Sequence, residues 1–158
     1  MKSIYQILLT CSLLAAIAAC ENETKICDQT LRSDLQVLFR RDSAGKVWDT
    51  TMPKVTLYAL GRDSIYKQQR LKNIFLTLSP LVDSSQFYLK VDSTLTPDTL
   101  TFRYTRTTHF ISPGCGFGTY YYLDTVVATR HTIDSVLINL KTVTSSNDTH
   151  LTLFFFNQ

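Results

Sequence analysis

Cysteine is the residue type in this sequence most able to do covalent chemistry, and four cysteines are present among its 158 residues. Cys11 lies inside an uncharged apolar run, residues 4–19, and Cys20 follows that run directly. Cys27 and Cys115 lie far apart in the rest of the chain. A thiol can be acylated, oxidised to a disulfide or used as a metal ligand, so each position needs its own assignment.

The start of the chain has the layout of an export signal. Lys2 supplies the positive charge, and the apolar run after it is too short for a transmembrane helix and ends in small residues. The tetrapeptide Ile17-Ala18-Ala19-Cys20 resembles a bacterial lipobox. This resemblance implies that residues 1–19 are a lipoprotein signal peptide, and that Cys20 receives a diacylglyceryl group and becomes the acylated N-terminus. An ordinary cleaved signal is the alternative.

Residues 20–29 are expected to be a lipidated tether between the membrane and a folded domain, because residues 21–25 are short and polar. Two or more acyl chains anchor a protein stably where one does not. Glu21 and Glu23 also resemble the surface-export signals of Bacteroidetes lipoproteins. We therefore expect a cell-envelope protein attached to the outer membrane, facing the periplasm or the cell surface.

Cys27 and Cys115 are an even pair in what would be an oxidising compartment, so we predict a disulfide between them. The stretch Ser112-Pro113-Gly114-Cys115-Gly116 has the composition of a tight turn that would aim Cys115 at its partner. Two free thiols, a metal pair and an intermolecular bridge remain alternatives.

The charge balance argues against a nucleic-acid partner. The formal net charge is +3, and loss of Lys2 with the signal peptide would lower it further. Such a charge is too small to attract nucleic acid or a membrane surface by electrostatics alone. Membrane attachment is therefore assigned to the lipid on Cys20.

From residue 30 onward, apolar residues recur with a period of two, which indicates strands with one buried and one wet face. The clearest case is Leu100, Phe102 and Tyr104 against Thr99 and Arg103. Further alternating runs lie at residues 35–39, 55–59, 74–78, 87–91, 120–127, 136–140 and 151–155. The pattern predicts an all-β fold of about eight strands: a single antiparallel β-sandwich, immunoglobulin-like or similar, or a small barrel.

Turn residues such as Asp42 to Gly45, Ser79-Pro80 and Thr96-Pro97-Asp98 separate these runs. The length then fits one domain over residues 30–158. The uncertain part is residues 66–73, which are polar and basic and could form a helical turn or a long hairpin.

No catalytic motif is recognisable. His109, His131 and His150 have no short ligand spacing, and scattered surface histidines are commoner than a zinc site. A nucleophile pair of Cys115 with His109 would be excluded by the disulfide. We predict neither an enzyme, a cofactor nor a metal.

Runs of aromatic residues at Tyr120-Tyr121-Tyr122 and Phe154-Phe155-Phe156 must send neighbouring side chains to opposite faces. If Tyr121 points into the core, Tyr120 and Tyr122 point outward, or the reverse. Tyrosine suits contact with sugars or proteins, so Tyr120 and Tyr122 are the candidate binding surface. Burial between sheets is the alternative for these aromatics.

A tripeptide of Asp, then Ser or Thr, then a small or apolar residue recurs along the chain. The Asp begins the tripeptide at positions 42, 49, 63, 92, 98, 124 and 134. Side-chain-to-backbone bonds in turns explain the pattern structurally. The tripeptide also resembles the acceptor pattern of general O-glycosylation in Bacteroidetes envelope proteins, which implies glycans on exposed copies.

The order of these features resembles a family of small Bacteroidetes lipoproteins of unknown function. The resemblance rests on the lipobox cysteine, Ile26-Cys27-Asp28, Pro113-Gly114-Cys115-Gly116-Phe117, Leu123-Asp124-Thr125 and Ile133-Asp134-Ser135-Val136. It implies an envelope lipoprotein with an all-β domain, with Cys20 as anchor and Cys27 and Cys115 as staple. We expect a structural or interaction domain in an envelope assembly, with an envelope protein as partner. A small-ligand or glycan-binding module that uses the tyrosines is the alternative.

Overall fold

The computed structural model describes residues 27, 32–61 and 63–156, so the predicted signal peptide and most of the predicted tether lie outside the described residues. The described part contains eleven strands and no helix. They are β1 (Asp34–Ser43), β2 (Lys46–Asp49), β3 (Met52–Ala59), β4 (Ser64–Leu71), β5 (Asn73–Thr77), β6 (Ser84–Lys90), β7 (Asp98–Ser112), β8 (Gly116–Ala128), β9 (Ile133–Ile138), β10 (Thr142–Val143) and β11 (Thr149–Phe155).

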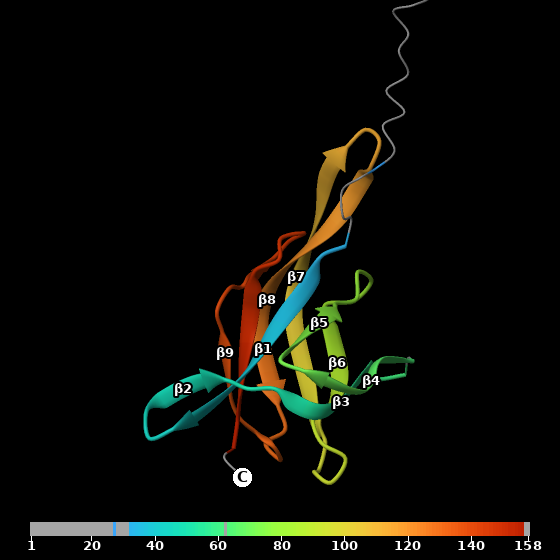
Figure 1. Ribbon diagram of the computed structural model, residues 1–158. Coiled ribbons are helices and arrows are strands. Elements are labelled where there is room, and N and C mark those ends of the chain that lie inside the picture. Colours follow the sequence, from blue (N-terminus) through green and yellow to red (C-terminus); the bar gives the residue numbers. More distant parts are fainter. Residues whose placement is uncertain (1–26, 28–31, 62, 157–158) are drawn as a thin grey trace, which may run out of the picture.

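Two sheets pack face to face as a sandwich, as the alternating pattern predicted (Figure 1). One sheet has the order β2-β1-β11-β9, and β5 pairs with β1 as well. The other has the order β10-β8-β7-β6-β3-β4. Neighbouring strands in the second sheet are antiparallel, which suits sheets that bury one face and leave the other in water.

The core lies between the sheets and is made of the residues that the period of two placed on one face of each strand. These buried side chains include Leu35, Val37, Phe39, Val55, Leu57, Ile74, Leu76, Phe87, Leu89, Leu100, Phe102, Leu151, Leu153 and Phe155. Two edge-to-face aromatic pairs pack within it, with ring centroids 5.4 Å apart for Phe39–Phe155 and 5.7 Å apart for Phe87–Phe102. At the C-terminal end Phe155 is buried while Phe156 is exposed, as alternation requires.

The expected number of strands was too low, and the three that were missed are all short or exposed strands at sheet edges. β2 and β4 expose most of their side chains, and β10 is two residues long. A strand that is wet on both faces carries no alternating pattern, so the sequence offers no signal for it.

Residues 66–73, whose structure the sequence left uncertain, fall mostly in β4. There Gln68 has a positive φ of 49° and the register against β3 is irregular. Leu140, expected in the core, lies beyond the end of β9 and is 39% exposed.

One pair of strands departs from the predicted antiparallel arrangement. β1 and β11 run parallel, with Val37 opposite Leu151 and Phe39 opposite Leu153. A parallel pair needs a long crossover connection, and here the rest of the domain supplies it. The two ends of the domain are thereby hydrogen-bonded to each other in the middle of one sheet.

A buried carboxylate ties the start of β7 to the start of β9. Asp98 is 1% exposed, and its two oxygens accept hydrogen bonds from the backbone N–H groups of His131, Thr132 and Ile133, at 2.9, 2.9 and 3.2 Å. The hydroxyl groups of Thr129 and Thr132 donate to it as well. A buried charge is tolerated when it is bonded in this way.

None of the described residues forms a helix long and apolar enough to cross a membrane.

Candidate interaction site on the β7–β8 arm

The hairpin of β7 and β8 extends beyond both sheets as an arm, which we define as residues 105–122 (Figure 1). Its strands stay in register with each other from Thr105 opposite Tyr122 to Phe110 opposite Phe117, and the register shifts once before Ser112 opposite Gly116 at the turn. The neighbouring strand β6 pairs with β7 only as far as Arg103, and β10 reaches β8 only at Tyr121 and Tyr122. Most of the arm, in the described structure, is therefore a two-stranded ribbon.

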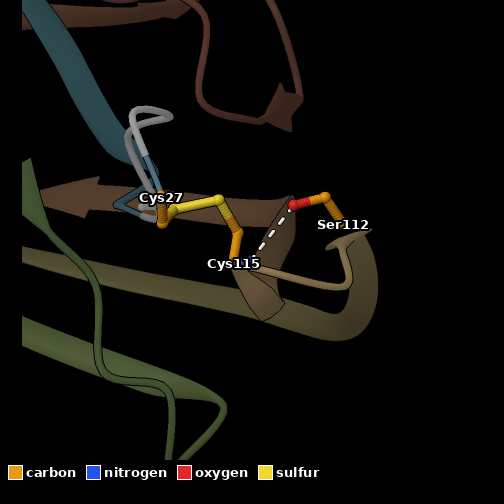
Figure 2. Close-up of a disulfide and its surroundings, with 3 residues drawn as sticks. All are labelled: Cys27, Ser112 and Cys115. Atoms are coloured by element: carbon orange, nitrogen blue, oxygen red, sulfur yellow. Dashed lines mark hydrogen bonds between the residues drawn. A yellow bond between two sulfur atoms is a disulfide. The ribbon is translucent and has the colours of Figure 1, made fainter. Parts of the chain in front are cut away.

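The predicted disulfide is present and lies at the tip of this arm. Cys27 and Cys115 are bonded, with their Cα atoms 4.8 Å apart (Figure 2). The Cys115 N–H donates to the backbone oxygen and the Oγ of Ser112, at 3.2 and 3.1 Å, which closes the turn. Gly116 follows with φ of +72°, a conformation that favours glycine. Cys27, expected in the tether, is thus fastened to the end of the arm.

Three side chains fix the base of the arm to the loop between β5 and β6. The Tyr104 hydroxyl bonds both backbone groups of Ser79 and lies 2.7 Å from the Ser85 Oγ. The Tyr121 hydroxyl donates to the Leu78 carbonyl at 3.2 Å.

Arg106 provides the third connection. Its guanidinium donates to the carboxylate of Asp83 and to the carbonyl of Pro80, both at 2.6 Å. The arm therefore leaves the sandwich in a defined direction, although its outer part lacks neighbouring strands.

Burial shifts the pKa of Tyr121 upward from its usual range, and the nearby Tyr104 adds to the shift while Arg106 opposes it. The phenol of Tyr121 therefore stays protonated and able to donate its hydrogen bond. Tyr104 and Tyr121 also pack edge to face, with ring centroids 5.3 Å apart. These two tyrosines serve to position the arm.

Tyr120 and Tyr122 lie on the face of the arm opposite Tyr121, as predicted for alternating side chains. Tyr122 is 47% exposed, and the ammonium of Lys141 lies 5.7 Å from its ring centroid. Tyr120 is half-buried because its ring stacks on His109 at 4.6 Å. Of the two candidate residues, Tyr122 offers the more accessible ring.

Sequence reasoning missed the aromatic pair on the other face of the arm. Phe110 and Phe117 are opposite each other in register, with ring centroids 5.3 Å apart, and are 50% and 68% exposed. The available signal was the charge pattern, because no Asp, Glu, Lys or Arg occurs between Thr107 and Leu123. A long uncharged stretch that is nevertheless exposed is unusual at a protein surface.

The three histidines do not converge. His109 lies on the arm, His131 lies beside Asp98 in the turn before β9, and His150 lies on β11. Contrary to the expectation of surface histidines, His150 is fully buried, and its Nδ1 accepts a hydrogen bond from the Gln36 N–H at 3.2 Å. Within the described ranges no group of three His, Cys, Asp or Glu residues could hold a metal ion.

A groove of about 600 Å³ lies beside the base of the arm, between the β3–β4 turn and the β5–β6 loop. Some of its polar side chains are bonded within the protein: Arg32 donates to Asp34 and Thr77, and the Oγ of Ser85 accepts from the Ser79 N–H at 3.1 Å. Because these side chains serve the structure, we do not take the groove as the candidate site.

The fold and the arm define this protein as a two-sheet β-sandwich that carries a disulfide-fastened hairpin arm. Residues 54–155 match a family of unknown function (DUF6452), and the chain belongs to that family. The match includes Cys115 and the whole arm and leaves out Cys27 and β1, although β1 lies in the middle of one sheet. No curated protein and no solved structure matches the chain.

Proposed function

We propose that this protein is a lipid-anchored component of the cell envelope whose β-sandwich is an interaction domain in an envelope assembly. In this proposal Cys20 carries the lipid, and the face of the arm that exposes Tyr122, near the base of the arm, contacts a partner protein. The observation that carries it is the arm itself: a projecting, largely uncovered ribbon fastened at its tip to Cys27, seven residues after Cys20.

The uncovered state of the arm supports a role in binding. A two-stranded hairpin alone is at best marginally stable in water, and unpaired strand edges invite pairing with another chain. The arm here is held in one conformation by a disulfide at its tip and by Tyr104, Tyr121 and Arg106 at its base. A rigid, exposed, aromatic ribbon loses little conformational entropy when it binds, which favours recognition.

The chemistry of the arm supports binding in preference to catalysis. His109 stacks on Tyr120, and Arg106 is paired with Asp83. Cys115 is oxidised. His109 and Cys115, the side chains of the arm best suited to act as base or nucleophile, are thus used for structure, and we propose a function without catalysis.

Photo-crosslinking from the arm tests the proposal. A photoreactive phenylalanine replaces Tyr122 in the lipoprotein in intact cells, and the same group replaces Val47 as the matched control. Val47 is similarly exposed, at 45%, and lies on β2, at the far end of the sandwich from the arm (Figure 1). We expect one protein adduct of discrete mass from position 122 and none from position 47.

The absence of an adduct at position 122, or identical adducts from both positions, would contradict the proposed interface. In that case the glycan-binding alternative is tested directly. Binding of the purified protein to immobilised envelope glycans that Tyr122→Ala abolishes would replace the assembly proposal with that alternative.

We also propose that exposed copies of the Asp-Ser/Thr tripeptide carry glycans. Ser43, Ser64, Ser93 and Thr125 are exposed, which modification requires. At some copies the Asp side chain closes a turn, as in the hydrogen bond from the Thr94 N–H to Asp92 at 3.0 Å. An intact mass equal to lipid plus polypeptide alone would refute glycosylation.

A further inference from the structure

The tip of the arm, which we define as residues 110–117, combines exposed aromatic rings with a lack of Asp, Glu, Lys and Arg side chains. Phe110 and Phe117 form an exposed ring pair on the face of the arm opposite Tyr120. On this face the nearest formal charge along β7 is Arg106, and it is neutralised by Asp83 at 2.6 Å. Such a surface costs little to transfer from water into the interfacial layer of a bilayer, where aromatic side chains are favoured.

The disulfide determines where this surface lies relative to the predicted lipid. Cys27 is seven positions after Cys20, and an extended chain of that length spans at most about 25 Å. Because Cys27 is bonded to Cys115, with their Cα atoms 4.8 Å apart, the tip of the arm stays within about 30 Å of the acylated residue. The tip can therefore reach the headgroup region of the bilayer that holds the lipid.

We infer that the arm tip is a second membrane contact, in which Phe110 and Phe117 insert into the headgroup region of the bilayer that holds the lipid on Cys20. The inference rests on the proposed lipid anchor. In this arrangement the tip contacts lipid, while Tyr122, nearer the base of the arm and on the other face, stays accessible to a protein partner.

The β5–β6 loop lies on the same face of the arm, at its base. Leu81 and Val82 are 78% and 52% exposed, and the loop is fastened to the arm by the bonds of Arg106 to Pro80 and Asp83. Several apolar contacts at one end of the molecule would orient the sandwich on the bilayer, with β2 and the C-terminal end of β11 away from it (Figure 1).

Tryptophan fluorescence in vesicles that contain brominated phosphatidylcholine tests this inference, because the chain has a single tryptophan. Wild-type Trp48 on β2, far from the tip, is the matched control. In the variant Trp48→Phe/Phe117→Trp the reporter is at the tip, where the exposed site accepts the substitution without repacking. We expect quenching by the bromolipid and a blue-shifted emission for the tip tryptophan, and neither change for Trp48.

The outcomes separate this inference from the lipid anchor. If the lipoprotein does not float with the vesicles, the anchor proposal fails. If it floats and the tryptophan at position 117 is quenched no more than Trp48, the inference is overturned. The second reporter, Trp48→Phe/Phe110→Trp, should behave like the first, and release of the arm by Cys27→Ser/Cys115→Ser should reduce quenching at position 117 while flotation persists.

Discussion

At the scale of single residues, Asp98 is the buried carboxylate that joins the start of β7 to the start of β9. It lies at the point where β7 begins, and it satisfies three consecutive backbone N–H groups in the turn that leads into β9. Without the carboxylate these donors would be buried next to the core with no acceptor. The turn and the pairing of β9 with β11 therefore depend on it.

Asp98→Ala is expected to lower the free energy of unfolding by about 3 kcal/mol or more, because each orphaned buried donor costs on the order of 1–3 kcal/mol. Urea denaturation followed by fluorescence measures the change. Asp124→Ala is the matched control at an exposed site of β8 and should change stability by less than about 0.5 kcal/mol. Equal urea midpoints for the two variants would show that the hydrogen bonds of Asp98 contribute nothing to the free energy of unfolding.

His150 makes stability depend on pH. Burial lowers the pKa of this imidazole below its ordinary value of 6.5, and the nearby charge of Asp148 opposes this shift. A base whose pKa is lower in the folded state binds protons more readily when unfolded. Its contribution to stability is therefore complete above about pH 6.5 and is lost progressively as the pH falls below that value.

His150→Gln should flatten this dependence. Urea midpoints measured between about pH 7.5 and about pH 5.5 are expected to fall less in the variant than in the wild type. His109→Gln, on the exposed arm, is the control and should keep the wild-type slope. If the urea midpoint of His150→Gln changes with pH as much as that of the wild type, another group causes the pH dependence.

At the scale of elements, the disulfide is the feature that makes the arm part of the domain. It closes a loop of 88 residues and ties the arm tip to the segment that precedes β1. Chain entropy predicts that Cys27→Ser/Cys115→Ser lowers the free energy of unfolding by about 3–5 kcal/mol. A urea midpoint that does not fall, in a variant shown by mass to lack the bond, would contradict this.

The strands that could be predicted are those with one buried face. Leu100, Phe102 and Tyr104 are buried as the period of two requires, and the same holds for the inward residues of β1, β3, β5, β6 and β11. The edge strands could not be predicted, since a strand wet on both faces shows no period. The parallel pairing of β1 with β11 was also invisible, because alternation reveals a face and not a neighbour.

The candidate site was predicted in part for similar reasons. Counting cysteines paired Cys27 with Cys115, and alternation placed Tyr120 and Tyr122 opposite Tyr121. The length of the arm was not foreseen, because beyond Tyr104 neither face of β7 is buried. Phe110 was overlooked for the same reason, and only the charge-free stretch around it marks the tip.

At the scale of the whole molecule, the features divide between two ends. The Cys27–Cys115 disulfide, the aromatic tip and the β5–β6 loop lie at one end, while β2 and the end of β11 lie at the other (Figure 1). We propose that the first end faces the membrane that holds the lipid, and that a partner protein binds the side of the arm. The orientation, more than any single side chain, determines which surfaces a neighbour in the envelope can reach.

Intact mass spectrometry of the protein extracted from cell envelopes tests whether Cys20 carries the lipid. We expect a chain that begins at Cys20, carries the added mass of a diacylglyceryl group and is recovered in the membrane fraction, whereas Cys20→Ala remains unprocessed. A mature chain that begins at another residue, or that begins at Cys20 without acyl mass and is recovered in the soluble fraction, would contradict it.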